Sequence, residues 1–158
     1  MGLRFDSQEK SLDKLFEMVS KLEEDEIKAH LAKYLCIQAS GYLENVIKEL
    51  IAEYHTGTCK QSTANFVNDK LKNFTNINDE KLSNFLSSFN SEWENQFKQK
   101  ASEQHLSSLT SIISQRNQIA HGNASRSNIS YKSMVQYYAD LKEIVKILKN
   151  IIDKKNKA

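Results

Sequence analysis

The sequence contains no proline and only four glycines among its 158 residues. Sheets and their hairpins normally use both residue types in turns, so this scarcity argues against a β-rich protein. Apolar residues form 39% of the chain and charged residues 27%, which is enough for the core and the solvated surface of one domain. We therefore predict one all-helical domain spanning residues 1–158, with its core at about residues 7–156.

Long apolar runs are also missing. No window approaches the run of about 18 apolar residues that a membrane span requires, and the N-terminus, MGLRFDSQEK, lacks the apolar stretch of a signal peptide. These absences predict a cytoplasmic protein with no membrane partner. Lys and Arg number 22 against 20 Asp and Glu, a net charge of +2, so any site for a polyanion has to be local.

Metal-ligating and phosphate-binding patterns are equally scarce. The two cysteines, Cys36 and Cys59, are too few for a disulfide framework or a four-thiolate zinc site. His55 and Cys59 have the spacing of a zinc-ligand pair, but Gly57 interrupts the helix between them and no second pair is evident. The chain also lacks a glycine-rich phosphate loop and the paired carboxylates of a metal-dependent nuclease. We expect no cofactor and no metal.

Apolar residues recur every three or four positions along most of the chain, as in amphipathic helices. The longest pattern predicts a central helix from about Asp25 to His55, with Gly57 as its C-terminal cap. The final pattern, Met134 to Ile152, predicts a long C-terminal helix. The other predicted helices lie at about 7–23, at three short segments between 62 and 101 with breaks near Asn76 and Asn90, and at about 102–121.

Two features of the long helices leave questions of packing open. Gly41 lies inside the central helix, where glycine costs about 1 kcal/mol relative to alanine, so we expect another backbone or side chain to pack closely against it. The apolar seam of the C-terminal helix has a coiled-coil-like spacing and could face the central helix, a second protomer or both. The sequence does not choose between these partners.

The helix at 102–121 carries an arginine in the middle of its apolar face. At about 100° per residue, the apolar positions of this helix fall within an arc centred close to Arg116. A buried guanidinium needs a carboxylate, carbonyl groups or an anion as partner, and Glu44 is one candidate for a purely structural ion pair. His121 lies about 140° further round an ideal helix. Both side chains can reach one spot only if the helix ends there, as Gly122 permits, or if a second copy contributes.

The run from Ser114 to Gly122, SQRNQIAHG, resembles the Arg-x4-His motif of the HEPN superfamily (higher eukaryotes and prokaryotes nucleotide-binding domain). It has the form in which Asn117 follows the arginine and Ala120 precedes the histidine. Three further segments are similar to the RiboL-PSP type of HEPN domain. They are the stretch of the central helix from Tyr34 to Glu44, residues 78–93, and the last helix from near Tyr131.

The resemblance implies an all-α, HEPN-like helical bundle with long central and C-terminal helices and short helices between them. It also implies a homodimer in which two Arg-x4-His motifs face each other and cut RNA without a metal, by attack of the ribose 2′-OH on the adjacent phosphate. Arg116, Asn117 and His121 would be the catalytic residues, and Glu44 a supporting polar residue from the central helix. Such domains are expected in toxin, stress or phage-defence systems, with an antitoxin or another regulatory partner.

Two alternatives remain open. A non-catalytic HEPN module would bind RNA or a nucleotide, or act as a dimerising adaptor, with Arg116 only structural. A plain helical interaction domain would carry the motif by chance. Catalysis predicts a solvent-accessible His121 close to Arg116 of the same or a partner chain, in basic surroundings. A structural role predicts that Arg116 is sealed against Glu44.

Overall fold

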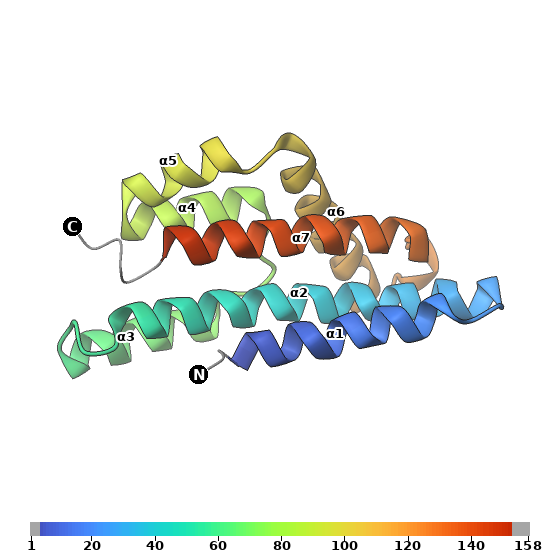
Figure 1. Cartoon of the computed structure of the whole chain (residues 1–158), viewed down its shortest axis with the longest axis horizontal. Coiled ribbons are helices and arrows are strands. Elements are labelled where there is room, and N and C mark those ends of the chain that lie inside the picture. Colours follow the sequence, from blue (N-terminus) through green and yellow to red (C-terminus); the bar gives the residue numbers. More distant parts are fainter. Residues whose placement is uncertain (1–3, 153–158) are drawn as a thin grey trace.

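The computed structural model describes residues 4–152, which contain seven α-helices, one short 3-10 helix and no β-strand (Figure 1). The elements are α1 (Arg4–Ser20), α2 (Asp25–His55), α3 (Gln61–Lys72), α4 (Asp79–Phe89), α5 (Ser91–Lys100), α6 (Glu103–Ala120), the 3-10 helix η1 (Ala124–Arg126) and α7 (Tyr131–Ile151). The prediction of an all-helical bundle with long central and C-terminal helices is confirmed. The end of the predicted core, residues 153–156, lies outside the described residues.

The predicted helix boundaries hold to within a few residues, and asparagines define two of the breaks. The Asn78 side chain accepts the backbone N–H of Lys81 at 2.8 Å, and the Asn90 side chain accepts that of Glu92 at 2.9 Å. A short polar side chain at the N-cap satisfies a backbone donor that the helix itself leaves without a partner. These two asparagines therefore start α4 and α5, and they divide the aromatic-rich middle of the chain into short helices.

The long helix α2 lies at the centre of the bundle and packs against α1, α6 and α7 (Figure 1). The seam of α7 is turned inward along its whole length, since each seam side chain is at most 4% exposed. The seam residues are Met134, Tyr138, Leu141, Val145, Leu148 and Ile152. The seam of the C-terminal helix thus packs within its own chain and is not available to a second protomer.

Gly41 is partly buried on α2, but there is open space where its side chain would be. A Cβ placed at this position would meet no atom within 4 Å among the described residues outside its own helix turn. The expectation that a neighbouring backbone or side chain packs closely there is therefore wrong for the single chain. Glycine lowers the stability of a helix interior, and no contact within the chain explains why it is present at this position.

Helix α1 begins at Arg4, three residues earlier than predicted, because its first turn is anchored to α2. Phe5 is 0% exposed, and its backbone N–H donates to the Glu49 carboxylate at 3.1 Å. This bond satisfies one of the free N–H groups at the start of the helix. A long-range partner, which periodicity cannot reveal, therefore extends α1.

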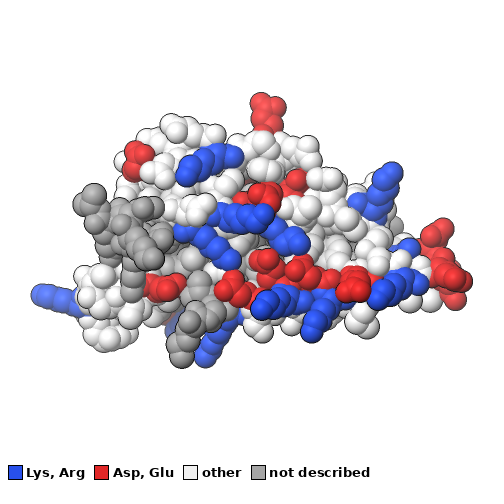
Figure 2. All heavy atoms as spheres, viewed as in Figure 1, with Lys and Arg blue, Asp and Glu red and all other residues white. Residues whose placement is uncertain are grey.

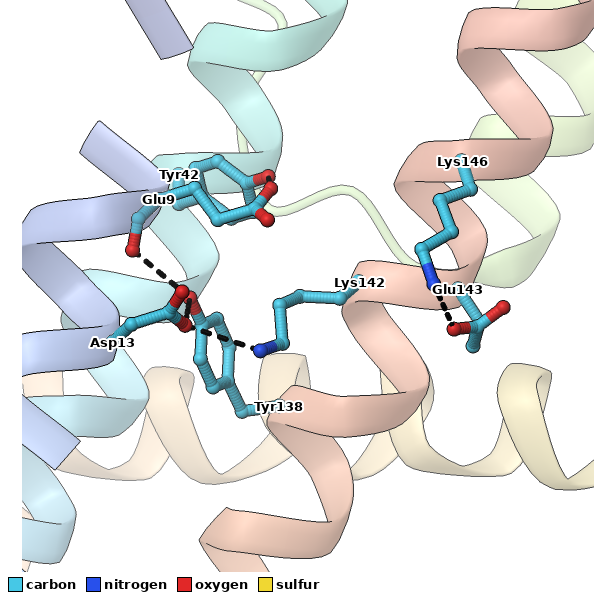
Figure 3. Close-up of polar contacts among 7 residues, drawn as sticks. All are labelled: Glu9, Asp13, Tyr42, Tyr138, Lys142, Glu143 and Lys146. Atoms are coloured by element: carbon cyan, nitrogen blue, oxygen red, sulfur yellow. Dashed lines mark hydrogen bonds and ion pairs between the residues drawn. The ribbon is translucent and has the colours of Figure 1, made fainter. Parts of the chain in front are cut away.

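A cluster of tyrosines and carboxylates joins α1 to α2 and α7 (Figure 3). The Tyr42 hydroxyl donates to Glu9, and the Tyr138 hydroxyl donates to Asp13 at 2.8 Å. Lys142 also pairs with Asp13, at 3.1 Å. Burial, followed by the neighbouring carboxylates, raises the pKa of both tyrosines above the ordinary value. Both phenols therefore remain protonated donors that hold α1 in place.

On the same side of the molecule, Lys and Arg side chains alternate with Asp and Glu side chains over α1 and α7 (Figure 2). Ion pairs account for part of this alternation. Lys149 pairs with Asp6 at 3.0 Å, and Lys146 pairs with Glu143 at 2.5 Å. The lysines of α7 are thus partly neutralised, which makes this face a poor candidate for binding a polyanion.

Candidate active site

The candidate site lies at the C-terminal end of α6, where the helix is stopped by a glycine. His121 is the C-cap residue, and its N–H donates to the Asn117 carbonyl at 3.1 Å. Gly122 has a φ of 76°, in the left-handed region that side chains disfavour. The N–H of Asn123 then donates back to the Gln118 carbonyl at 3.0 Å. This is a Schellman-type cap, and it ends the helix at the histidine as the sequence predicts.

The segment after the cap is fastened back onto α6 and α2. The Ser127 hydroxyl donates to the Gln115 side-chain carbonyl at 2.6 Å, and the amide of Gln115 donates to Asn128 at 3.4 Å. From α2, the Lys33 ammonium donates to the Ala124 carbonyl at 2.7 Å. These bonds fix the path of the chain around His121. Nothing in the sequence pattern singles out Lys33 or Gln115, since their partners are set by the loop.

Arg116 is half-buried one turn before the end of α6. Its Nη1 donates to the side-chain oxygen of Asn117 at 3.4 Å, a long bond to a neutral group. Among residues 4–152 it forms no ion pair, because no carboxylate oxygen lies within 4.0 Å of it. A half-buried guanidinium whose only side-chain partner is a neutral amide keeps donors available for an anion.

Cys36 of α2 fixes where the motif sits on the central helix. Its thiol donates to the Ile112 carbonyl at 3.3 Å. Burial raises the pKa of Cys36 to about 12, although the backbone N–H and the charge of Arg116 act in the opposite direction. The thiol therefore stays protonated and acts as a packing donor rather than a nucleophile. Arg116 lies beside this contact, one helical turn after Ile112.

Glu44 lies away from the motif. Its carboxylate accepts the backbone N–H of Asn76 at 2.9 Å, in the connection between α3 and α4. Asn76 has a φ of 53°, so the carboxylate secures a strained turn. Along α2, Lys33 and Cys36 contact the loop and α6, and Glu44 follows Cys36 by about 12 Å of helix. The ion pair with Arg116 is not formed within the chain, and Glu44 has a structural role in this turn.

His121 is exposed to solvent, as a catalytic role requires. The nearby cationic side chains Lys33 and Arg126 form no ion pair among the described residues. Lys33 reaches the segment after His121 through the Ala124 carbonyl, and Arg126 lies in η1 of that same segment. The structure places Arg116 and Asn117 in the last turns of α6 and His121 at its C-cap, and the Arg116–Asn117 hydrogen bond joins two of these side chains. Glu44 bonds Asn76 instead.

The described part of the chain offers neither a metal-binding cluster nor a membrane-spanning helix. In residues 4–152, no group of three or more His, Cys, Asp or Glu side chains is arranged to hold a metal ion. None of the helices in that range combines the length and the apolarity that crossing a bilayer requires.

The fold and the site together define a class, that of helical domains carrying an Arg-x4-His motif at a capped helix end. Residues 4–154 match the RiboL-PSP-HEPN family, and the chain belongs to this family. The match extends the resemblance seen in the sequence to nearly the whole chain. No curated protein matches the chain, and no solved structure matches it either.

Proposed function

We propose that this protein is a metal-independent endoribonuclease that cuts RNA at a composite site built from the Arg-x4-His motifs of two copies. The observation that carries the proposal is the state of Arg116, a half-buried guanidinium with no acidic partner among the described residues, one turn from the exposed His121. Membership of the RiboL-PSP-HEPN family supports the same conclusion. RNA supplies the anion that this guanidinium lacks.

The reaction needs a proton acceptor, a proton donor and a group that holds the phosphate. Imidazole can fill either of the first two roles near neutral pH. In the proposed step, one His121 takes the proton of the ribose 2′-OH as the 2′-oxygen attacks the adjacent phosphorus. The bond from phosphorus to the 5′-oxygen breaks, and that oxygen takes a proton from the His121 of the second copy. The products are a 2′,3′-cyclic phosphate and a 5′-OH.

Arg116 would stabilise the charge that builds on the phosphorus oxygens. Its planar fork can donate two hydrogen bonds to a phosphate, and such bonds matter most where the charge grows in the transition state. Asn117 already accepts a bond from Arg116, so it would orient the guanidinium and hold a phosphate oxygen with its amide. Two histidines with different roles at one phosphate require two motifs, which is why the site is proposed to be composite.

The biological setting proposed for this activity is a toxin, stress or phage-defence system in the cytoplasm. An uncontrolled ribonuclease harms its host, so an antitoxin or another regulatory partner belongs to the proposal.

The test is cleavage of labelled RNA by the purified full chain in EDTA, with analysis of the fragment ends. Removal of a general acid or base costs about 100-fold or more, so His121→Ala should lower the rate by at least that factor. Loss of a transition-state donor costs about 100- to 1000-fold, which is the expected effect of Arg116→Ala. Arg4→Ala, which changes an exposed arginine of α1, is the matched control and should cleave like the wild type.

The results of this experiment distinguish the ribonuclease from the non-catalytic alternative. Cleavage that yields cyclic-phosphate ends and is lost in both site variants supports the proposal. Cleavage that persists in both variants points to another site or to a contaminating nuclease. RNA binding by the wild type without any cleavage favours the non-catalytic binding module, with Arg116 as a phosphate ligand only.

A further inference from the structure

A pocket of about 360 Å³ lies between α3 and α4, and we call it the α3–α4 pocket. It is remote from the candidate active site, because α3 follows the C-terminal end of α2, about 33 Å along that helix from Lys33 (Figure 1). Sites for small molecules have volumes of about 300–1,000 Å³ and mostly apolar walls. The pocket fits this description, since six of its lining side chains are apolar: Phe66, Val67, Leu71, Phe74, Phe85 and Phe89.

One wall of the α3–α4 pocket is a continuous row of aromatic rings. Phe74 stacks on Phe85 with 4.3 Å between the ring centroids, and Phe85 contacts Phe89 at 5.0 Å. Phe89 in turn stacks on the buried Trp93 of α5 at 6.0 Å. Each ring in the row is held by the next one, so this wall is formed before any ligand arrives.

The opposite wall carries Phe66 of α3, which is 63% exposed. Among the described residues, no other aromatic ring contacts Phe66, and the Lys70 ammonium lies 5.3 Å from the centre of its ring. Helix α3 stands away from α4 because Leu71 is its one buried residue. A flat ligand between Phe66 and the row of rings would bury apolar surface on both of its faces, and aromatic rings pack well in this way.

The charge at the pocket is positive. Lys70 is the one charged residue among the described residues that line it, and it forms no ion pair within residues 4–152. The nearby Lys81 lies over the Phe74 ring at 5.3 Å, but its ammonium already donates to the Thr75 carbonyl. Lys70 therefore keeps its donors available, and the pocket complements a ligand with a single negative charge.

The polar groups of the lining limit the ligand further. Apart from Lys70, the one polar side chain among the lining residues is Ser88, and its hydroxyl already donates to the Phe85 carbonyl at 2.7 Å. A nucleobase has donors and acceptors around its edge, and burying them here without partners would reduce the affinity. A hydrocarbon ring has no such groups. The lining thus favours a hydrocarbon ring system over a base.

We propose that the α3–α4 pocket binds a small aromatic acid, with its ring system between Phe66 and the row of rings and its anionic group at Lys70. This site is separate from the Arg-x4-His motif, and the inference does not depend on the proposed ribonuclease.

The test uses two naphthalene probes that differ in charge. One is 1-anilinonaphthalene-8-sulfonate, and the other, N-phenyl-1-naphthylamine, is the same molecule without the sulfonate. Trp93 is the single tryptophan of the chain and contacts Phe89 of the pocket, so energy transfer from Trp93 reports binding to the folded full chain. We expect saturable binding of one probe per chain. The sulfonate should bind about threefold more tightly, as expected for a partly exposed ion pair.

Variants on α3 locate the probes. Phe66→Ala removes an exposed ring, so it should keep the fold and raise the Kd of both probes about tenfold. Lys70→Met keeps the length of the side chain without its charge, so it should raise the Kd of the sulfonate about threefold and leave that of the neutral probe unchanged. Lys70→Arg should restore the preference for the sulfonate. Lys72→Met is the matched control, since Lys72 pairs with Asp69 and does not line the pocket. Circular dichroism checks that each variant is folded.

The proposal is supported if Phe66→Ala weakens the binding of both probes and Lys70→Met removes the preference for the sulfonate. A wild type that binds neither probe, or a folded Phe66→Ala variant that binds like the wild type, overturns the pocket as the binding site. Equal affinity of the wild type for the two probes overturns the acidic ligand, and so does a preference that Lys70→Met retains. Displacement of the sulfonate by adenosine monophosphate or by an RNA oligonucleotide would show a nucleotide site instead.

Discussion

Substitution of Gly122 by alanine would test whether the cap at the end of α6 positions His121. Gly122 has a φ of 76°, and the left-handed conformation costs a residue with a Cβ about 1–2 kcal/mol. Alanine also reduces the freedom of the unfolded chain, which offsets about 0.5 kcal/mol of that cost. The net loss in the free energy of unfolding should be about 1 kcal/mol, a drop of about 3 °C in Tm. A domain of ordinary stability would remain folded, so any loss of cleavage would come from the displaced histidine.

The matched control is Gly57→Ala, at the equivalent position after α2. Gly57 has a φ of 71° and the same open surroundings, but it lies about 30 Å further along α2 than the contacts around the motif. Urea unfolding should show similar losses of stability for both variants, and cleavage of labelled RNA should fall only for Gly122→Ala. Gly122→Asn should recover part of the activity, because asparagine tolerates the left-handed region better than alanine does. Equal activity of the two alanine variants would refute the argument that the cap positions His121, and unchanged stability would refute the strain estimate.

Two further predictions concern groups whose pKa is raised. Native protein treated with iodoacetamide at pH 8 should be modified at the half-buried Cys59 and not at Cys36, because burial raises the pKa of Cys36 to about 12. Mass spectrometry of the peptides checks this prediction. Equal labelling of the two cysteines would contradict it. The free energy of unfolding should fall as the pH rises above about 10, where unfolded tyrosines begin to ionise. Folding raises the pKa of Tyr42 and Tyr138. Their contribution to the free energy of unfolding is therefore fully present below the pKa of an unfolded tyrosine and is lost as the pH rises above it. The Tyr42→Phe and Tyr138→Phe double variant should flatten this decline in urea titrations, and an unchanged slope would show that other groups cause it.

Most of the fold could be predicted because helices are encoded locally. The apolar repeat over residues 25–55 and the glycine that follows it place α2 with the bounds observed. The asparagine caps of α4 and α5 follow from the same local chemistry. The start of α1 could not be predicted in this way, since it depends on Glu49, a residue more than forty positions further along the chain.

The candidate site, like the fold, could be predicted only where its residues lie close together in the sequence. Arg116, Asn117 and His121 lie within six residues at the end of one helix and its C-cap, so spacing and the glycine that follows were enough to group them. Glu44 is 72 residues away in the sequence, and whether it reaches Arg116 depends on how α6 crosses α2. The contact between Cys36 and Ile112 fixes that crossing, and it leaves Glu44 beside Asn76.

The sequence by itself determined the all-helical class, the order of the helices and the residues of the motif, because each depends on neighbours within a few turns. Only the tertiary structure decided which apolar surfaces remain uncovered. It buried the seam of α7 and left Met18 of α1 and Tyr34 and Ile37 of α2 exposed, with open space at Gly41. The physical reason is that a periodic pattern shows that a helix face is apolar but not what covers it, since that depends on contacts between residues far apart in the chain.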